Sequence, residues 1–109
     1  MSVLERGVID FAGVDENKND FALGISDHLD WVDIKDHIEH LSNKIEDYLV
    51  AIKSNEIYDL FPDSKNLNKI ILVYGKYKLS KSGVDFYSKH RRITEELDWK
   101  LEFKLFNPS

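Results

Sequence analysis

Between residues 32 and 54, apolar residues recur every three or four positions, a spacing that places them on one side of an amphipathic helix. The stripe consists of Ile34, Ile38, Leu41, Ile45, Tyr48, Leu49 and Ile52. Asp30 or Asp33 can accept hydrogen bonds from the free amides of the first turn, and an acidic start suits the helix dipole. We therefore predict a long helix over residues 32–54, ended by Ser54-Asn55.

A second, shorter stripe predicts another helix that ends near Leu97, with Ser80 or Ser82 as its N-cap. Its apolar positions are Val84 or Phe86, then His90, Ile93 and Leu97. Within residues 56–68, Ile57-Tyr58-Asp59-Leu60-Phe61 could form a short helical turn, but Pro62 disfavours its continuation. We predict that residues 56–68 form a connecting loop with apolar anchors.

Short apolar runs predict four strands. Residues 8–12 and 21–25 flank a polar turn at 15–20, which is typical of a hairpin. Residues 70–74 are continuously apolar and mostly β-branched, which predicts an interior strand buried on both faces or nearly so. Residues 99–105 alternate apolar and charged side chains, so this strand has one buried and one wet face.

The order of these elements is ββαβαβ. Each helix has a single apolar stripe and the last strand a single apolar face, so each element must bury one side. We predict one α+β domain over residues 1–109, a two-layer sandwich in which two helices cover one face of a four-stranded mixed sheet. The connection from the third to the fourth strand is long enough for a right-handed parallel crossover.

The net charge of −5 is unevenly distributed along the chain. Residues 1–64 carry −10 and residues 65–92 carry +7. Either the two segments neutralise each other within the fold, or they form a dipolar surface that steers a partner. An acidic chain is a poor general binder of nucleic acid, because phosphate contacts need a basic surface.

Cysteine is absent, which excludes a disulfide framework and thiolate chemistry and fits a reducing cytoplasm. Residues 1–6 carry no signal-peptide core, and no apolar run approaches membrane-spanning length. We expect a cytoplasmic protein without a membrane anchor.

Candidate chemistry concentrates where the second strand meets the long helix. Asp27, His28, Asp30 and Trp31 gather carboxylates, an imidazole and one of two tryptophans at a chain reversal. This junction is either a helix start or a site. In the structural reading the aspartates cap, His28 bonds a backbone carbonyl, and Trp31 packs across the corner, so that Trp31→Ala costs about 3–5 kcal/mol.

On the helix itself, Asp33, His37 and His40 fall on one flank of the apolar stripe. Two imidazoles and a carboxylate could bind a divalent ion, but further ligands are lacking and the spacing is not that of zinc proteases. The ordinary alternative is a solvated helix flank with i,i+4 pairs. We predict no metal and no cofactor.

A basic patch is the third candidate. It comprises Lys76, Lys78, Lys89, Arg91 and Arg92, interleaved with Tyr74, Tyr77 and Tyr87. Aromatic and basic side chains together can hold single-stranded nucleic acid. We favour instead a counterpart to the acidic N-terminal half, in this molecule or another.

The segment Asp27-His28-Leu29-Asp30-Trp31 also carries a resemblance. With Val8-Ile9-Asp10, residues 41–49, Glu56-Ile57-Tyr58, Phe61-Pro62-Asp63 and Lys76-Tyr77, it resembles a family of small uncharacterised bacterial proteins with an Asp-His-Leu-x-Trp segment. Lys53-Ser54-Asn55 departs from the aliphatic or glycine-rich stretch of that family. The resemblance implies a bacterial cytosolic source and brings no activity.

These observations predict a non-catalytic protein-interaction or regulatory module, whose partner is another protein or a second copy of the chain. The alternative is a small hydrolase or metal-dependent enzyme using the Asp27–Trp31 junction and the histidine pair. Ala22 and Gly24 leave the outer sheet face flat, which suits a homodimer through that face or the sheet edge. In the opposing case, residues 56–67 or Phe106-Asn107-Pro108 fold over the face.

Overall fold

The computed structural model describes residues 2–106. In chain order the elements are β1 (Phe11–Asp15), β2 (Asp20–Asp27), α1 (Ile34–Lys53), α2 (Glu56–Leu60), the 3₁₀ helix η1 (Pro62–Asn66), β3 (Asn68–Gly75), α3 (Lys81–Glu95) and β4 (Lys100–Leu105). The strands lie in the order β1-β2-β3-β4; β1 and β2 are antiparallel, and the other two pairs are parallel. The prediction of an α+β fold with a four-stranded mixed sheet is confirmed.

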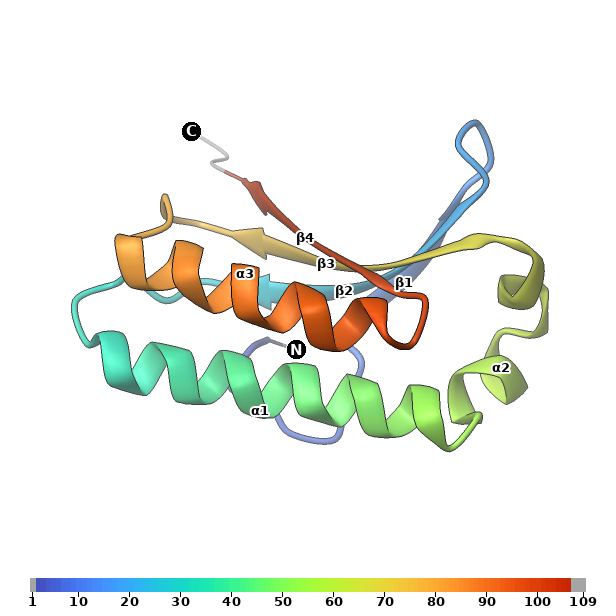
Figure 1. The fold of residues 1–109 in the computed structure, drawn as a ribbon, viewed down its shortest axis with the longest axis horizontal. Coiled ribbons are helices and arrows are strands. Elements are labelled where there is room, and N and C mark those ends of the chain that lie inside the picture. The colour runs from blue at the N-terminus through green and yellow to red at the C-terminus, as the bar shows by residue number, and fades with distance from the viewer. Residues whose placement is uncertain (1, 107–109) are drawn as a thin grey trace.

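Both long helices, α1 and α3, lie along the same face of the sheet (Figure 1). Each begins at a side-chain cap. Asp33 accepts a hydrogen bond from the amide of Asp36 at the start of α1, and Ser80 accepts from the amide of Gly83 at the start of α3. These caps satisfy amides that have no partner within the helix.

The core fills the space between the helices and the inner face of the sheet. Its fully buried side chains include Leu23 and Ile25 from β2, Ile71 and Val73 from β3, and Trp99 just before β4. Alternate residues of each strand contribute to it, as the pleat requires. The structure describes no helix long and apolar enough to cross a membrane.

Residues 56–68 correct one prediction, because they form α2 and η1 rather than a loop. The cause is Asn55, whose φ of 65° turns the chain after α1 so that a new helical turn starts and buries Ile57. Pro62 begins η1, where its fixed φ suits a first helical position. The segment packs toward the inner face, where the Phe61 ring lies 5.2 Å from that of Phe21.

The first strand is a second correction: β1 starts at Phe11, three residues later than predicted. Directly before Phe11, a side-chain contact takes the place of strand pairing, because Asp10 Oδ2 accepts a hydrogen bond from the amide of Ser26 at 2.9 Å. Val8 is also held elsewhere, because its carbonyl accepts from Lys44. The turn is formed by residues 16–19, and Asp15 accepts the amide of Asn17 within it.

β3 is interior, as its apolar run indicates, but its outer face is only partly buried. Ile71 and Val73 face the helices, whereas Leu72 and Tyr74 on the other face are only half-buried. No residue of 56–67 lines the hollow on that outer face. Phe106 does reach its edge, where its ring lies 6.1 Å from that of Tyr74. Asn107 and Pro108 lie outside the described residues.

Candidate functional site

The predicted junction is built around a buried pair, Asp27 and His37. Asp27 ends β2 and His37 lies in the first turn of α1, and both are almost fully buried. His37 Nε2 lies 2.6 Å from Asp27 Oδ2, and His37 Nδ1 lies 2.8 Å from the carbonyl oxygen of Asp30. The pair therefore fixes the end of a strand to the beginning of a helix.

The partners of His37 decide what its ring can do. A carbonyl oxygen only accepts, so Nδ1 donates to Asp30, while Nε2 is held against a carboxylate oxygen of Asp27. Both ring nitrogens are engaged inside the protein. His37 thus has no lone pair directed toward a substrate or a metal ion, which a general base or ligand requires.

Trp31 covers this pair. Its ring stacks on the His37 ring with centroids 3.7 Å apart and planes inclined by 25°. On the other side it reaches α3 at Gly83, where a Cβ atom would lie only 2.9 Å from Trp31 Cζ2. Trp31 is half-buried and closes the corner between the two helices, and Gly83 is the residue that makes room for it.

Tyr87 of α3 is fully buried. Burial and the nearby negative charge of Asp27 raise the pKa of the Tyr87 hydroxyl far above its ordinary value. No described residue accepts or donates a hydrogen bond to this hydroxyl. Tyr87 therefore adds a neutral polar atom to the junction and no acid or base near neutral pH.

The other predicted junction residues do not converge with this pair. Asp30 accepts the amide of Val32 and shapes the loop. His28 is exposed, and His40 lies on the flank of α1, where its Nε2 is 3.5 Å from Asp36 Oδ1. Within residues 2–106, no group of three or more histidine, aspartate or glutamate side chains could hold a metal ion.

The predicted basic patch is divided in space. Lys76 and Lys78 lie between β3 and α3, whereas Lys89, Arg91 and Arg92 lie in the second half of α3. Eleven residues of helix, about 16 Å, separate Lys81 from Arg92. Arg91 also turns back to donate from Nε to the carbonyl of Leu101. The structure therefore places two of the five residues before α3 and three in its second half.

A second buried pair was not predicted from the sequence. Lys44 of α1 is fully buried, and its Nζ lies 2.8 Å from Asp10 Oδ1. It also donates to the carbonyls of Glu5 and Val8, each at 2.6 Å. A signal was present, because Lys44 lies between Leu41 and Ile45 in the apolar stripe. A charge at such a position needs a buried partner.

Tyr48, one turn after Lys44, completes this arrangement. Its hydroxyl donates to the carbonyl of Gly24 and accepts from the amide of Asp10. The pKa of Tyr48 is well above that of a free tyrosine, mainly because the side chain is buried. We call Asp10, Lys44 and Tyr48 the N-terminal latch, because they hold residues 5–10 against α1 and β2.

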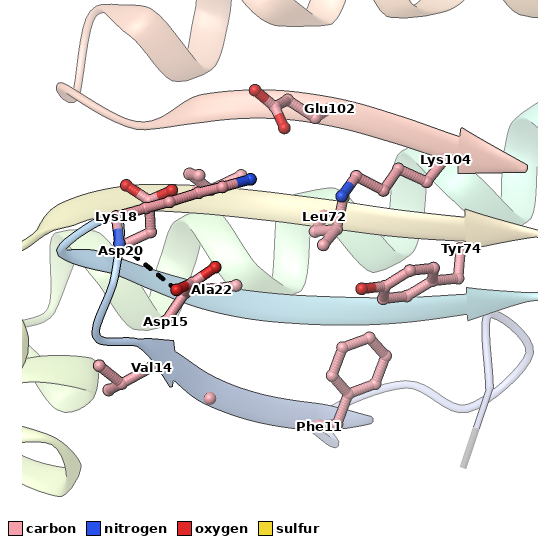
Figure 2. Close-up of a pocket in the computed structure, with 12 residues that line it drawn as sticks. Phe11, Val14, Asp15, Lys18, Asp20, Ala22, Leu72, Tyr74, Glu102 and Lys104 are labelled. Atoms are coloured by element: carbon pink, nitrogen blue, oxygen red, sulfur yellow. Dashed lines mark hydrogen bonds between the residues drawn. The ribbon is translucent and has the colours of Figure 1, made fainter.

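The remaining surface of interest is the side of the sheet opposite α1 and α3, which we call the open face. The strand register places on it Phe11 and Gly13 of β1, Ala22, Gly24 and Ser26 of β2, Ile70, Leu72 and Tyr74 of β3, and Lys100, Glu102 and Lys104 of β4. This face holds a shallow hollow of about 260 Å³. Figure 2 shows Lys18, from the β1–β2 turn, lying across it.

Aromatic rings gather at one end of the open face. The Phe11 ring lies 5.4 Å from the Tyr74 ring, and Phe106 continues the row. Phe11 is 38% exposed and Phe106 is 57% exposed. The Phe11 ring occupies the place of a side chain at Gly24, where a Cβ atom would come within 1.8 Å of it. Apolar surface is thus held in a defined position and left uncovered by the described residues.

The chain belongs to a family of unknown function (DUF6572), whose model matches residues 1–107. This confirms that it is a member of an uncharacterised family; the bacterial source and the Asp-His-Leu-x-Trp segment as a family mark stay predictions. No curated protein and no solved structure matches the chain.

Proposed function

We propose that this chain is a non-catalytic, cytoplasmic protein-interaction module that binds a partner protein through the open face. The supporting observation is that Phe11, Leu72 and Tyr74 stand on one side of a sheet whose other side is already covered by helices (Figures 1 and 2). Half-exposed aromatic and aliphatic side chains within a charged rim are the usual layout of a protein interface.

The rigidity of the sheet favours the same proposal. The N-terminal latch and the Asp27–His37 pair both attach β2 to α1 by buried hydrogen bonds. A pre-organised surface loses little conformational freedom on binding, which leaves more of the contact energy for affinity. The open face therefore has the properties of a ready binding surface.

The enzymatic alternative has less support from the geometry. It requires that His28, Asp30, His37 and His40 act together, and His37 has both nitrogens engaged within the fold. A metal titration followed by thermal unfolding tests this alternative. An ion at a hundred times its dissociation constant stabilises the fold by about 2.7 kcal/mol, and a shift of that size with zinc, manganese or magnesium would favour the enzyme.

The interaction module is tested by photo-crosslinking in cells of the source organism. Tyr74 is replaced by p-benzoylphenylalanine, and Val50, an exposed apolar residue of α1 on the opposite layer, is replaced as the matched control. We expect a discrete protein adduct from position 74 and none from position 50. An absence of adducts from position 74, or equal adducts from both, contradicts the proposal.

A further inference from the structure

We propose that the open face binds a second copy of this chain, face to face about a two-fold axis. This inference rests on the proposed function and names its partner. It begins from the shape of the face, which has a ridge beside a trough. Leu72 and Tyr74, both half-buried, form the ridge along β3, while Ile70 before them is buried. Beside this ridge β2 offers only Ala22 and Ser26, with the Phe11 ring over Gly24 between them.

A ridge beside a trough is complementary to itself. When two copies meet face to face with their strands crossed, Leu72 on the ridge of each can enter the trough of the other, since a two-fold interface joins the same patch on both chains. The trough is open at Ala22, which lies between the β1–β2 turn and the Phe11 ring and lines the hollow (Figure 2). This opening lies beside Leu72, so Leu72 of one copy faces Ala22 of the other.

The charges at the rim of the hollow are arranged in the same self-complementary manner. Asp15 and Asp20 lie at the corner formed by the β1–β2 turn, and Lys104 lies toward the opposite corner, near the end of β4. Lys18 and Glu102 also line the hollow. None of these five side chains forms an ion pair within the described chain, so each remains able to pair across an interface.

These positions define the orientation of the second copy. The two-fold axis lies between the two sheets, parallel to them, above the middle of β2 and β3. It brings the acidic corner of each chain over Lys104 of the other chain, and Lys18 of each over Glu102 of the other. Every such pair then occurs twice. The strands of the two sheets cross at a large angle, which is one of the two arrangements adopted by packed sheets.

The area of the open face sets the strength of this dimer. Four strands at about 4.8 Å and six residues at about 3.3 Å give roughly 400 Å² per copy. Specific stable interfaces bury about 800 Å² per partner. The dimer is therefore weak and concentration-dependent, and its charged rim makes it weaker at high salt.

Sedimentation equilibrium over a concentration series tests the inference. We expect the average mass of the wild type to rise toward that of two chains, and to rise less in high salt. Leu72→Lys places one charge from each copy at the centre of the interface. This variant should therefore have the mass of a single chain at every concentration. Val50→Lys, an equivalent change at an exposed position of α1, should behave as the wild type.

A charge-reversal pair tests the orientation. Lys104→Asp alone should weaken dimerisation by about tenfold, since two rim pairs per dimer change from attraction to repulsion. Adding Asp15→Lys to the same chain should restore it. Lys89→Asp on α3 is the matched control for the change in net charge. Circular dichroism verifies that each variant is folded.

The possible outcomes separate this inference from the proposed function. A single-chain mass at all concentrations, or a dimer unaffected by Leu72→Lys, overturns the two-fold dimer. If crosslinks from position 74 then join the chain to a different protein, the interaction module stands and only its partner changes. If position 74 gives no protein adduct at all, both proposals are wrong.

Discussion

Replacing Lys44 by methionine tests the N-terminal latch. The change keeps most of the length of the side chain and removes the ammonium group that Asp10, Glu5 and Val8 contact. Breaking a buried ion pair by removing one partner costs about 3–5 kcal/mol, because the other charge stays buried without compensation. Asp10 keeps one hydrogen bond, from the amide of Ser26.

Two backbone carbonyls also lose their donor, and an unsatisfied buried acceptor costs about 1–3 kcal/mol. Residues 5–8 are largely exposed and can turn these carbonyls toward water, so we expect a total near 4 kcal/mol. A domain of this length has a free energy of unfolding of roughly 5–15 kcal/mol. Lys44→Met should therefore remove a large part of the stability without preventing folding.

Urea unfolding followed by tryptophan fluorescence measures this effect. Lys53→Met, at an exposed lysine of the same helix, is the control and should change the free energy by less than about 0.5 kcal/mol. The double variant Lys44→Met/Asp10→Asn buries no unpaired charge and should be more stable than Lys44→Met alone. A cost under about 1 kcal/mol for Lys44→Met, or simple additivity in the double variant, would refute the reasoning.

Three further predictions follow from other contacts. Trp31→Ala should cost about 2–3 kcal/mol, below the range for a fully buried ring, because Trp31 is half-buried and its main contact is the His37 ring; chemical unfolding measures it. Burial raises the pKa of both Tyr48 and Tyr87, so the unfolded chain releases their protons at a lower pH than the folded protein does. The melting temperature should therefore be constant up to about pH 10 and fall above it, and it should fall less steeply in Tyr87→Phe. The hydrogen bonds from Arg6 lower the pKa of Asp47, so the stabilisation that they provide is present at neutral pH and is lost as pH falls below about 4. In Asp47→Asn the melting temperature should therefore depend less on pH in this acidic range.

Elements whose signal is local could be predicted from the sequence. The periodic stripe of α1 gave bounds within two residues of the observed Ile34–Lys53, because burial of one helix face is recorded in every turn. Ser80 was one of two proposed caps and is the observed one. A short helical turn over residues 57–61 was an alternative to the favoured loop, and the observed α2 begins after the left-handed Asn55, which no periodicity of five residues can reveal. The helix η1 was not predicted.

The candidate site depended more on distant contacts. Asp27 and His37 could each be singled out, but their pairing requires the loop between them to fold back, and the sequence favoured a solvated flank for His37. Lys44 and Asp10 are 34 positions apart, and nothing local indicates that they meet. The pleat of β2 and β3 did indicate the open face, although not which set of β3 residues faces outward.

The two faces of the sheet are connected through β2 and the start of β1. The latch holds residues 5–10 against α1, and the chain enters β1 directly after Asp10. Phe11, the next residue, lies over Gly24 and beside Tyr74 on the open face. Gly24 in turn gives its carbonyl to Tyr48 on the helix side. The latch therefore holds the chain directly before Phe11, whose ring lines the hollow. A sheet that only enclosed a core would not need its outer aromatic residue positioned from the other side. This connection supports the proposal that the open face is a binding surface.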